Sequence, residues 1–335
     1  NPDNSITLHI NSTIKDTNLT LEINGKNYLI KITNETGLYT TPELNPDNYT
    51  YHIIYDGDKL TKGIEKSGQF ELKNNAQLDV KNLTKYYSST DRLNITLTQK
   101  NRPIANETIY ITINGATYKR TTNTEGKTSI AINLASGNYT ATITFNNTQY
   151  NPITKNIQIN IKNTIYGDDI TKVYKNDTQY YAIFTDNTGK LLKNTTVTFN
   201  INGVFYQRTT NTEGIAKLNI NLQQGTYILT ATNPETNEQY SNTITVLSKI
   251  QENSDLTKYY RNNSQYTVKI IKSNGQTAKT GEKVTFNING VFYERYTDEN
   301  GYAKLNINLQ PGNYIITAEY DGCKVSNNIT VLTIL

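Results

Sequence analysis

An internal repeat of about 88 residues constrains the fold of this chain more than any other feature. An Asn-Gly dipeptide recurs in every copy, with its Asn at residues 24, 114, 202 and 289. Residues 197–206 and 284–293 are identical, and residues 109–118 form a third, weaker match. Repeats of this length are typical of arrays in which each copy is one structural unit. The sequence therefore predicts four domains, at residues 1–78, 79–166, 167–252 and 253–335.

The first copy departs from this pattern at its start. Only 23 residues precede its Asn-Gly dipeptide, and it lacks a motif that opens the other three copies. That motif is Leu83-Thr84-Lys85-Tyr86, Ile170-Thr171-Lys172-Val173 and Leu256-Thr257-Lys258-Tyr259. We expect copy one to be either truncated, without its first strand, or a divergent capping unit.

The Asn-Gly dipeptide predicts a tight β-hairpin, because a type I′ turn needs positive φ at both central residues. In copy three this turn pairs Asn200 with Phe205 across the hairpin, so that Phe205 lies on the outer face. Strand alternation then predicts a core face made of Val197, Phe199, Ile201, Val204 and Tyr206.

Each copy contains about seven short segments of alternating polarity, separated by turns every 8–12 residues, and no segment has the apolar spacing of a helix. This pattern predicts an all-β chain of tandem Ig-like β-sandwich domains. The links between copies, such as residues 247–253, lack the Gly and Ser of flexible linkers. We therefore expect the domains to be arranged as an elongated rod.

Charge and composition argue against several functional classes. The net charge is +4 without a run of five basic residues, so we expect no nucleic-acid partner. No segment approaches 18 consecutive apolar residues, so the sequence predicts no membrane-spanning helix. Two histidines, His9 and His52, and the single Cys323 occur outside any catalytic or phosphate-binding motif. We expect no enzyme activity, no cofactor and no metal.

Residues 297–305 and 309–314 resemble the signature of bacterial-type Ig-like domains and collagen-adhesin B-type domains. The whole repeat, with its Lys-Tyr-Tyr opening and its Phe-Asn-Ile-Asn-Gly-Val-Phe-Tyr hairpin, is similar to repeats of adhesin-like surface proteins of methanogenic archaea. The resemblance covers copies two to four well and copy one in part. It implies a secreted, cell-surface adhesin whose stalk projects a binding region toward a glycan or protein of another cell or host surface. We expect the fragment to be a monomer.

Aromatic side chains support an alternative function, a module that itself binds a glycan or protein. Phe205 and Phe292 occupy outer-face positions, and Tyr49 and Tyr51 lie in copy one, which differs most from the others. Outward aromatic side chains can form a contact surface, and they can equally pack under a neighbouring loop. A third possibility is an accessory region of a larger surface enzyme.

The resemblance also implies two kinds of stabilising site. Some Ig-like arrays bind Ca²⁺ at junctions, where this chain has Asp168, Asp169 and Asp255, but neither junction offers three clustered carboxylates. Collagen-adhesin domains often carry a Lys–Asn isopeptide bond assisted by a buried acid. The residues that best match it are in copy four: Lys258, Asn327 or Asn328, and Glu319. In the alternative, Lys85, Lys172 and Lys258 are solvated charges at strand ends.

The isopeptide hypothesis predicts the mass of the denatured chain. Formation of the bond releases ammonia, so each cross-linked copy is expected to be about 17 Da lighter than its sequence. Intact-mass spectrometry measures this deficit, and peptide mapping separates it from succinimides at Asn-Gly, which lose the same mass. An unmodified mass would contradict the hypothesis.

Overall fold

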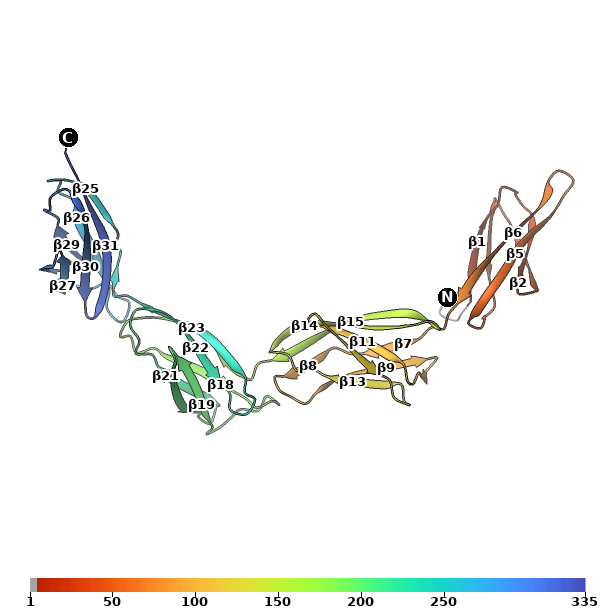
Figure 1. The fold of residues 1–335 in the computed structure, drawn as a ribbon, viewed down its shortest axis with the longest axis horizontal. Helices are drawn as coiled ribbons and strands as arrows, with labels where there is room; N and C mark the ends of the chain where they lie inside the picture. Colours follow the sequence, from red (N-terminus) through yellow and green to blue (C-terminus); the bar gives the residue numbers. More distant parts are fainter. Residues whose placement is uncertain (1–4, 335) are drawn as a thin grey trace. The chain divides into compact units, whose positions relative to one another are not determined.

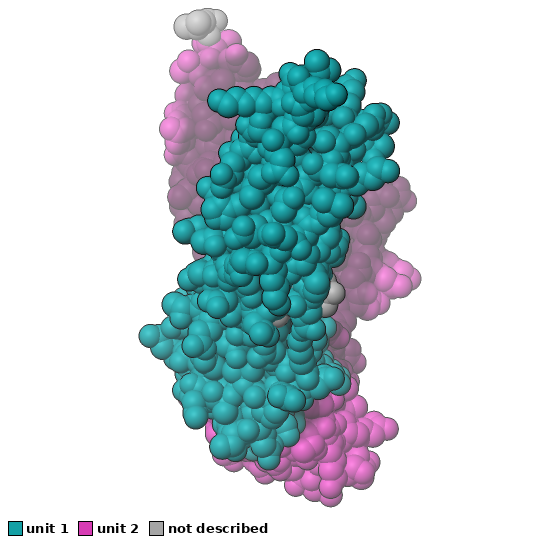
Figure 2. Space-filling view, turned by 90° about the vertical axis from the view of Figure 1, so that its right-hand side faces the viewer, with its two compact units in different colours: residues 1–85, 90–162 teal, residues 86–89, 163–335 magenta. Residues whose placement is uncertain are grey.

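The computed structural model describes residues 5–334, in which β-strands are the only long regular elements. The all-β prediction is confirmed. No helix in these residues is long and apolar enough to cross a membrane. The chain divides into two compact units, residues 1–85 with 90–162 and residues 86–89 with 163–335 (Figure 2).

Copy three, in the second unit, folds into two sheets (Figure 1). The smaller sheet has the strand order β16-β18-β21, and the larger has the order β17-β23-β22-β19-β20. Its strands are β16 (Ile165–Gly167), β17 (Ile170–Val173), β18 (Gln179–Phe184), β19 (Thr196–Ile201), β20 (Val204–Thr209), β21 (Ile215–Asn219), β22 (Gly225–Thr232) and β23 (Gln239–Leu247). Side chains from both sheets meet in one buried cluster, so the copy is an Ig-like sandwich.

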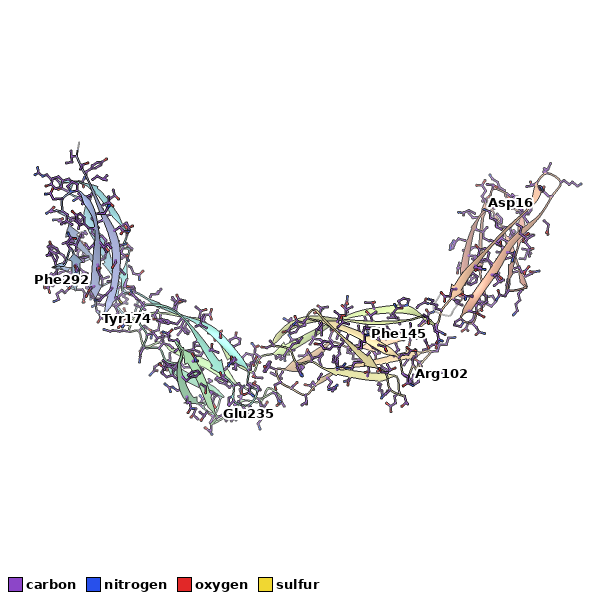
Figure 3. All side chains as sticks on the ribbon, in the orientation of Figure 1. Asp16, Arg102, Phe145, Tyr174, Glu235 and Phe292 are labelled. Carbon is purple, nitrogen blue, oxygen red and sulfur yellow. The ribbon has the colours of Figure 1, made fainter. Side chains whose placement is uncertain are left out.

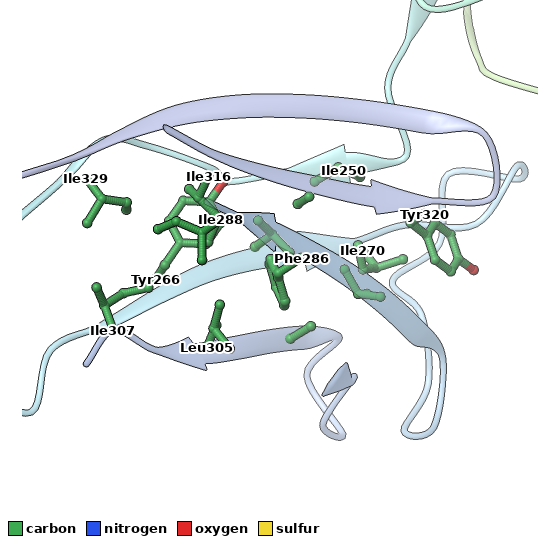
Figure 4. Close-up of a cluster of buried hydrophobic side chains, with 14 of the residues drawn as sticks. Ile250, Tyr266, Ile270, Phe286, Ile288, Leu305, Ile307, Ile316, Tyr320 and Ile329 are labelled. Atoms are coloured by element: carbon green, nitrogen blue, oxygen red, sulfur yellow. The ribbon is translucent and has the colours of Figure 1, made fainter. Parts of the chain in front are cut away.

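Copy four repeats this arrangement strand for strand. Its sheets have the orders β24-β26-β29 and β25-β31-β30-β27-β28. The strands are β24 (Ile250–Gln251), β25 (Leu256–Tyr259), β26 (Gln265–Ile270), β27 (Lys283–Ile288), β28 (Val291–Tyr296), β29 (Tyr302–Asn306), β30 (Gly312–Tyr320) and β31 (Cys323–Leu332). Tyr266 and Phe286 meet edge to face between the sheets, with ring centroids 5.8 Å apart (Figure 4). This geometry adds to the free energy gained from burying the two rings.

Copy two, in the first unit, has the same two-sheet plan. Its larger sheet has the order β12-β11-β14-β15-β8, and its smaller sheet joins β10, β9, β13 and β7. The strands are β7 (Gln77–Val80), β8 (Leu83–Tyr86), β9 (Arg92–Gln99), β10 (Arg102–Pro103), β11 (Thr108–Ile113), β12 (Ala116–Thr121), β13 (Lys127–Ala131), β14 (Gly137–Asn147) and β15 (Tyr150–Lys162).

Copy one has fewer strands than the others. Its sheets have the orders β1-β4 and β3-β2-β5-β6. The strands are β1 (Thr7–Asn11), β2 (Asn18–Ile23), β3 (Lys26–Lys31), β4 (Thr36–Thr40), β5 (Asp47–Gly57) and β6 (Lys62–Leu72). Among the described residues, copy one has no counterpart of β16 and β17.

The predicted Asn-Gly hairpins are confirmed in all four copies. The Asn residues have φ between 46° and 54°, and the following glycines between 74° and 78°. In copy three the register joins Asn200 to Phe205, as predicted. The prediction for Val204 was wrong, because its side chain is 50% exposed. β20 is the edge strand of a five-stranded sheet, and Val204 is its first residue, next to the hairpin turn, where its side chain reaches solvent.

A tyrosine corner closes every copy. The hydroxyl of Tyr227 donates to the carbonyl of Gln223, four residues upstream, at 2.9 Å. Equivalent bonds are made by Tyr49 to Asn45, Tyr139 to Ala135, and Tyr314 to Gln310. Because the hydroxyl is satisfied locally, the ring can pack on the core without leaving a polar atom unpaired.

The opening-strand lysines are buried, so the interpretation as solvated strand-end charges was wrong. Lys85, Lys172 and Lys258 are 4%, 5% and 4% exposed. The Nζ of Lys172 donates to the carbonyls of Ile220, at 2.8 Å, and Thr178, at 3.2 Å. Burial lowers the pKa of Lys85 and Lys172. The carbonyls that receive these bonds compensate for the lost hydration.

These lysines link the two sheets of each sandwich. Lys172 lies on β17 of the larger sheet, whereas Ile220 directly follows β21 of the smaller sheet. The Nζ of Lys85 donates to Ile132 at 3.1 Å, and that of Lys258 donates to Ile307 at 2.8 Å. We call this contact the inter-sheet lysine. It recurs in copies two, three and four.

Replacement of Lys258 by Met tests the inter-sheet lysine. The variant keeps the apolar stem but leaves buried carbonyls without donors, so copy four is expected to lose about 1–3 kcal/mol of stability. The exposed Lys279→Met variant is the control and is expected to change stability by less than about 0.5 kcal/mol. Calorimetric unfolding measures both. Equal stability of the two variants would contradict the role.

Candidate functional site

The two predicted outer-face phenylalanines are exposed. Phe205 on β20 is 70% exposed. Phe292 on β28, labelled in Figure 3, is 63% exposed. Each faces an asparagine across its hairpin, Asn200 or Asn287. The structure thus places both rings at the same position of two successive copies, beside a side-chain amide.

Further apolar side chains are exposed in the same two copies. Ile228 and Ile315, on the central strands β22 and β30, are 58% and 64% exposed. At the hairpin position, copy two has Thr117 in place of the phenylalanine, and its hydroxyl contacts Thr112 at 2.8 Å. The aromatic position is therefore specific to copies three and four, and copy two provides a natural comparison.

Tyr49 and Tyr51 are half-buried within copy one. The Tyr49 ring stacks on Phe70, with centroids 5.2 Å apart and an interplanar angle of 13°. The Tyr51 ring covers Gly68 on the neighbouring strand, where an added Cβ would lie 2.6 Å from the hydroxyl. Both rings pack against the copy-one core. Their role as a contact surface stays a prediction.

The three residues of the isopeptide hypothesis each have other partners. The Nζ of Lys258 donates to the carbonyls of Ile307, Ser264 and Asn262. The amide oxygen of Asn327 accepts from the Tyr266 hydroxyl at 2.5 Å. Glu319 forms an ion pair with Lys324 at 2.7 Å. The cross-link stays a prediction that the mass measurement tests.

The aspartates at the predicted junctions bind the backbone of their own copy. Asp169 accepts from the amide of Thr243 at 2.8 Å, and these bonds lower its pKa. Asp255 accepts from the amide of Asn328 at 2.8 Å, with the same effect on its pKa. Across residues 5–334, no three His, Cys, Asp or Glu side chains gather closely enough to hold a metal ion.

Copy three contains a buried polar cluster that the sequence did not suggest. The Glu238 carboxylate accepts from the amide of Thr164 at 2.5 Å and from its hydroxyl at 2.6 Å. The Asn233 side chain donates to the carbonyls of Thr164 and Thr185. Asn233 and Glu238 lie in the turn between β22 and β23, and nothing in the repeat pattern of the sequence marks them.

Within the second unit, a clasp joins copies three and four. Asp321, in the turn between β30 and β31, binds Lys175 of copy three and Lys249 of the link, each at 2.5 Å. Lys249 is 4% exposed. Tyr174, labelled in Figure 3, packs against the cores of both copies. Two lysines beside one carboxylate lower the pKa of Asp321.

Cys323 belongs to the same clasp. It follows the turn at Asp321 and Gly322, which have φ of 47° and 88°. The thiol is buried, and its Sγ accepts from the amide of Lys249 at 3.4 Å. Cys323, the first residue of β31, is thus a packed residue of the joint, a role that only the fold reveals.

No protein-family model and no curated protein matches the chain. Similar solved structures include a Ca²⁺-stabilised ice-binding adhesin of an Antarctic bacterium, with 15% identity, 99% of this chain and 95% of that chain covered, and a TM-score of 0.22. Another is the I9–I11 tandem of titin, with 12% identity, 77% and 100% coverage, and a TM-score of 0.28. A third is a Bacteroides ovatus protein in complex with a mixed-linkage heptasaccharide, with 14% identity, 76% and 67% coverage, and a TM-score of 0.22. TM-scores this low say nothing about what this chain binds.

Neutralising the clasp carboxylate is expected to uncouple copies three and four. Asp321→Asn leaves Lys249 buried without its counter-charge, which costs about 1–3 kcal/mol. Because the folded pKa is lowered, the clasp contributes stability above pH 3.8, the unfolded value, and loses it as pH falls through the folded pKa. Calorimetry measures whether the two copies melt together.

The control for this variant is Glu299→Gln in an exposed turn of copy four. It removes one charge without touching the clasp, so the transitions are expected to stay as in the parent chain. A parent chain whose copies three and four already melt separately near neutral pH would contradict the clasp.

Proposed function

We propose that the chain is a non-catalytic stalk fragment of a cell-surface adhesin, which projects a binding region for attachment to other cells or host surfaces. The observation that carries the proposal is the repetition of one closed sandwich. Copies two to four share the hairpin, the tyrosine corner and the inter-sheet lysine, and differ mainly on their outer faces. Repetition of a structural unit extends a chain without adding a new site.

The clasp between copies three and four supports the same function. A stalk transmits force along the chain, so its joints must resist bending and separation. Asp321 links the turn of copy four to both the link and copy three. The link residue Lys249 is buried, and the following residues form β24. This segment therefore lacks the freedom of a flexible linker.

The proposal includes four Ig-like domains at the repeat boundaries, residues 1–78, 79–166, 167–252 and 253–335. β7 and β16 extend across two of these boundaries, and β24 ends one residue before the third. We further propose an extracellular location at the surface of an archaeal cell, and a monomeric fragment whose partner is a glycan or protein of another cell.

A second candidate function is binding through the outer face of copies three and four. The exposure of Phe205 and Phe292 at equivalent positions favours it. Two rings on successive copies would let one extended glycan or protein contact both, which raises the effective affinity of a weak site. The stalk proposal instead requires no ligand on this face.

Stretching a single molecule between its ends tests the stalk. Four unfolding events are expected, one for each domain of 78–88 residues, and each releases roughly 260–300 Å of extended chain. A cross-linked copy would release less. Unfolding without discrete steps of similar length would contradict a stalk of repeated sandwiches.

The same chain, coated on beads, separates the two candidates. If the chain is only a stalk, the coated beads are expected not to attach to cells. Attachment that is lost in the Phe205→Ser, Phe292→Ser double variant, but kept in a Thr117→Ser control, would favour the binding module. Both phenylalanines are exposed, so the double variant is expected to fold normally.

A further inference from the structure

The larger sheet of copy three has an outer face without charged side chains. Alternation along each strand puts every second residue on the side away from the core. On β17, β19, β20, β22 and β23 these outward residues are all Thr, Ser, Asn, Gln, Phe, Ile, Leu or Val. Exposed protein surface ordinarily carries Lys, Glu, Arg and Asp. This face therefore offers little to a partner that binds through ion pairs.

One row of side chains crosses this face from strand to strand. Phe205 on β20 pairs with Asn200 on β19, and Asn200 pairs with Thr230 on β22. Thr230 pairs in turn with Ser241 on β23. Neighbouring strands lie about 4.8 Å apart, so the row extends roughly 14 Å across the sheet. We call these four residues, and their equivalents in copy four, the phenylalanine row.

Copy four has the same row, residue for residue: Phe292, Asn287, Thr317 and Ser326. The charged side chains elsewhere on its outer face form ion pairs with each other, Lys283 with Glu294 and Lys324 with Glu319. Ring, amide and hydroxyls therefore recur together in two successive copies.

The polar groups of the row lie ready to bind a ligand. The hydroxyl oxygens of Thr230 and Ser241 are 2.9 Å apart, and the equivalent pair in copy four has the same distance. One hydroxyl of each pair donates to the other, so each pair keeps one hydrogen and free lone pairs. The half-buried amide of Asn200 lies between the ring and the hydroxyls and can both donate and accept.

We propose that the phenylalanine rows bind a neutral polysaccharide, through hexose units that present a face of C–H groups. The proposal rests on the second candidate function above and names the class of its ligand. The face of an aromatic ring is partly negative and attracts the polarised C–H groups of a sugar. The amide and hydroxyls beside the ring match sugar hydroxyls, which donate and accept. The absence of charge on the copy-three face matches an uncharged ligand.

The size of the apolar area favours a polysaccharide over a protein. An ordinary protein interface buries about 800 Å² on each partner around an apolar centre. Each copy offers one exposed ring and one exposed isoleucine, Ile228 or Ile315, among hydroxyls and amides. A long polysaccharide can occupy the rows of both copies at once, so two weak sites add to one useful affinity.

Nuclear magnetic resonance on the full chain, labelled with ¹³C-phenylalanine, tests the proposal. The chain has seven phenylalanines, so their ring signals can be followed individually. Cellohexaose and mannohexaose are the neutral probes, and the hexamer of galacturonic acid is the charged probe. A neutral probe is expected to shift the signals of Phe205 and Phe292 and to leave those of the buried Phe199 and Phe286 in place. Because no ion pair forms, affinity is expected to change less than about twofold with salt.

Variants assign the binding to the rows. The Phe205→Ser, Phe292→Ser double variant is expected to bind the neutral probe at least tenfold more weakly in calorimetric titration. Tyr181→Ser is the matched control, because it removes a 48% exposed ring from β18 of the smaller sheet. This control is expected to bind like the parent chain.

Four results would overturn the proposal: no binding of either neutral probe, binding of the acidic hexamer alone, neutral binding that survives in the double variant, or shifts confined to buried phenylalanines. The coated beads separate this failure from that of the second candidate function. Periodate cleaves the vicinal diols of sugars. Attachment that depends on the two phenylalanines but survives periodate treatment of the cells would identify a protein partner, so that the binding module stands and the polysaccharide does not.

Discussion

Each complete copy depends on one segment that pairs with both of its sheets. In copy three, β16 extends the smaller sheet and β17 the larger, and the lysine between the layers binds the smaller sheet's carbonyls. A sandwich of fewer than 90 residues buries a modest share of its surface on folding. Contacts that bridge the edges of its two sheets therefore make a large contribution to its stability. The core positions at those sides are buried only where this segment is present.

Buried hydrogen bonds contribute to the stability of these sandwiches, whose single cysteine is a free thiol. The inter-sheet lysines and the Glu238 cluster place polar groups in the interior and pair them there, whereas the corner tyrosines pair their hydroxyls near the surface. Such groups stabilise a fold only when every donor and acceptor is paired. The tolerance for sequence change is therefore expected to be lower at these positions than at aliphatic core positions, where volume alone must be kept.

The sequence predicted well what depends on neighbouring residues along the chain. Asn-Gly set the hairpin register, and alternation predicted that Phe199 is buried and Phe205 exposed. It failed where the answer depends on the opposite layer. Val204 lies on the core side of its strand, yet at the start of an edge strand it is 50% exposed. Lys172 has the pattern of a surface charge, yet its amine is buried and donates to the carbonyl of Ile220, which follows β21 of the opposite sheet. The clasp at Asp321 joins residues 146 apart in sequence, beyond any local pattern.

The parallel pairing of the opening strand with the last strand has a consequence for folding. Ile170 pairs with Ile244, so copy three cannot close until almost all of it has left the ribosome. Contacts this distant in sequence are slow to form. Adjacent copies also present similar last strands, Ile244 to Val246 and Ile329 to Val331. Before its own last strand has been synthesised, an opening strand can therefore pair with the last strand of a neighbouring copy. Such pairing between copies is the misfolding route that we expect for this chain.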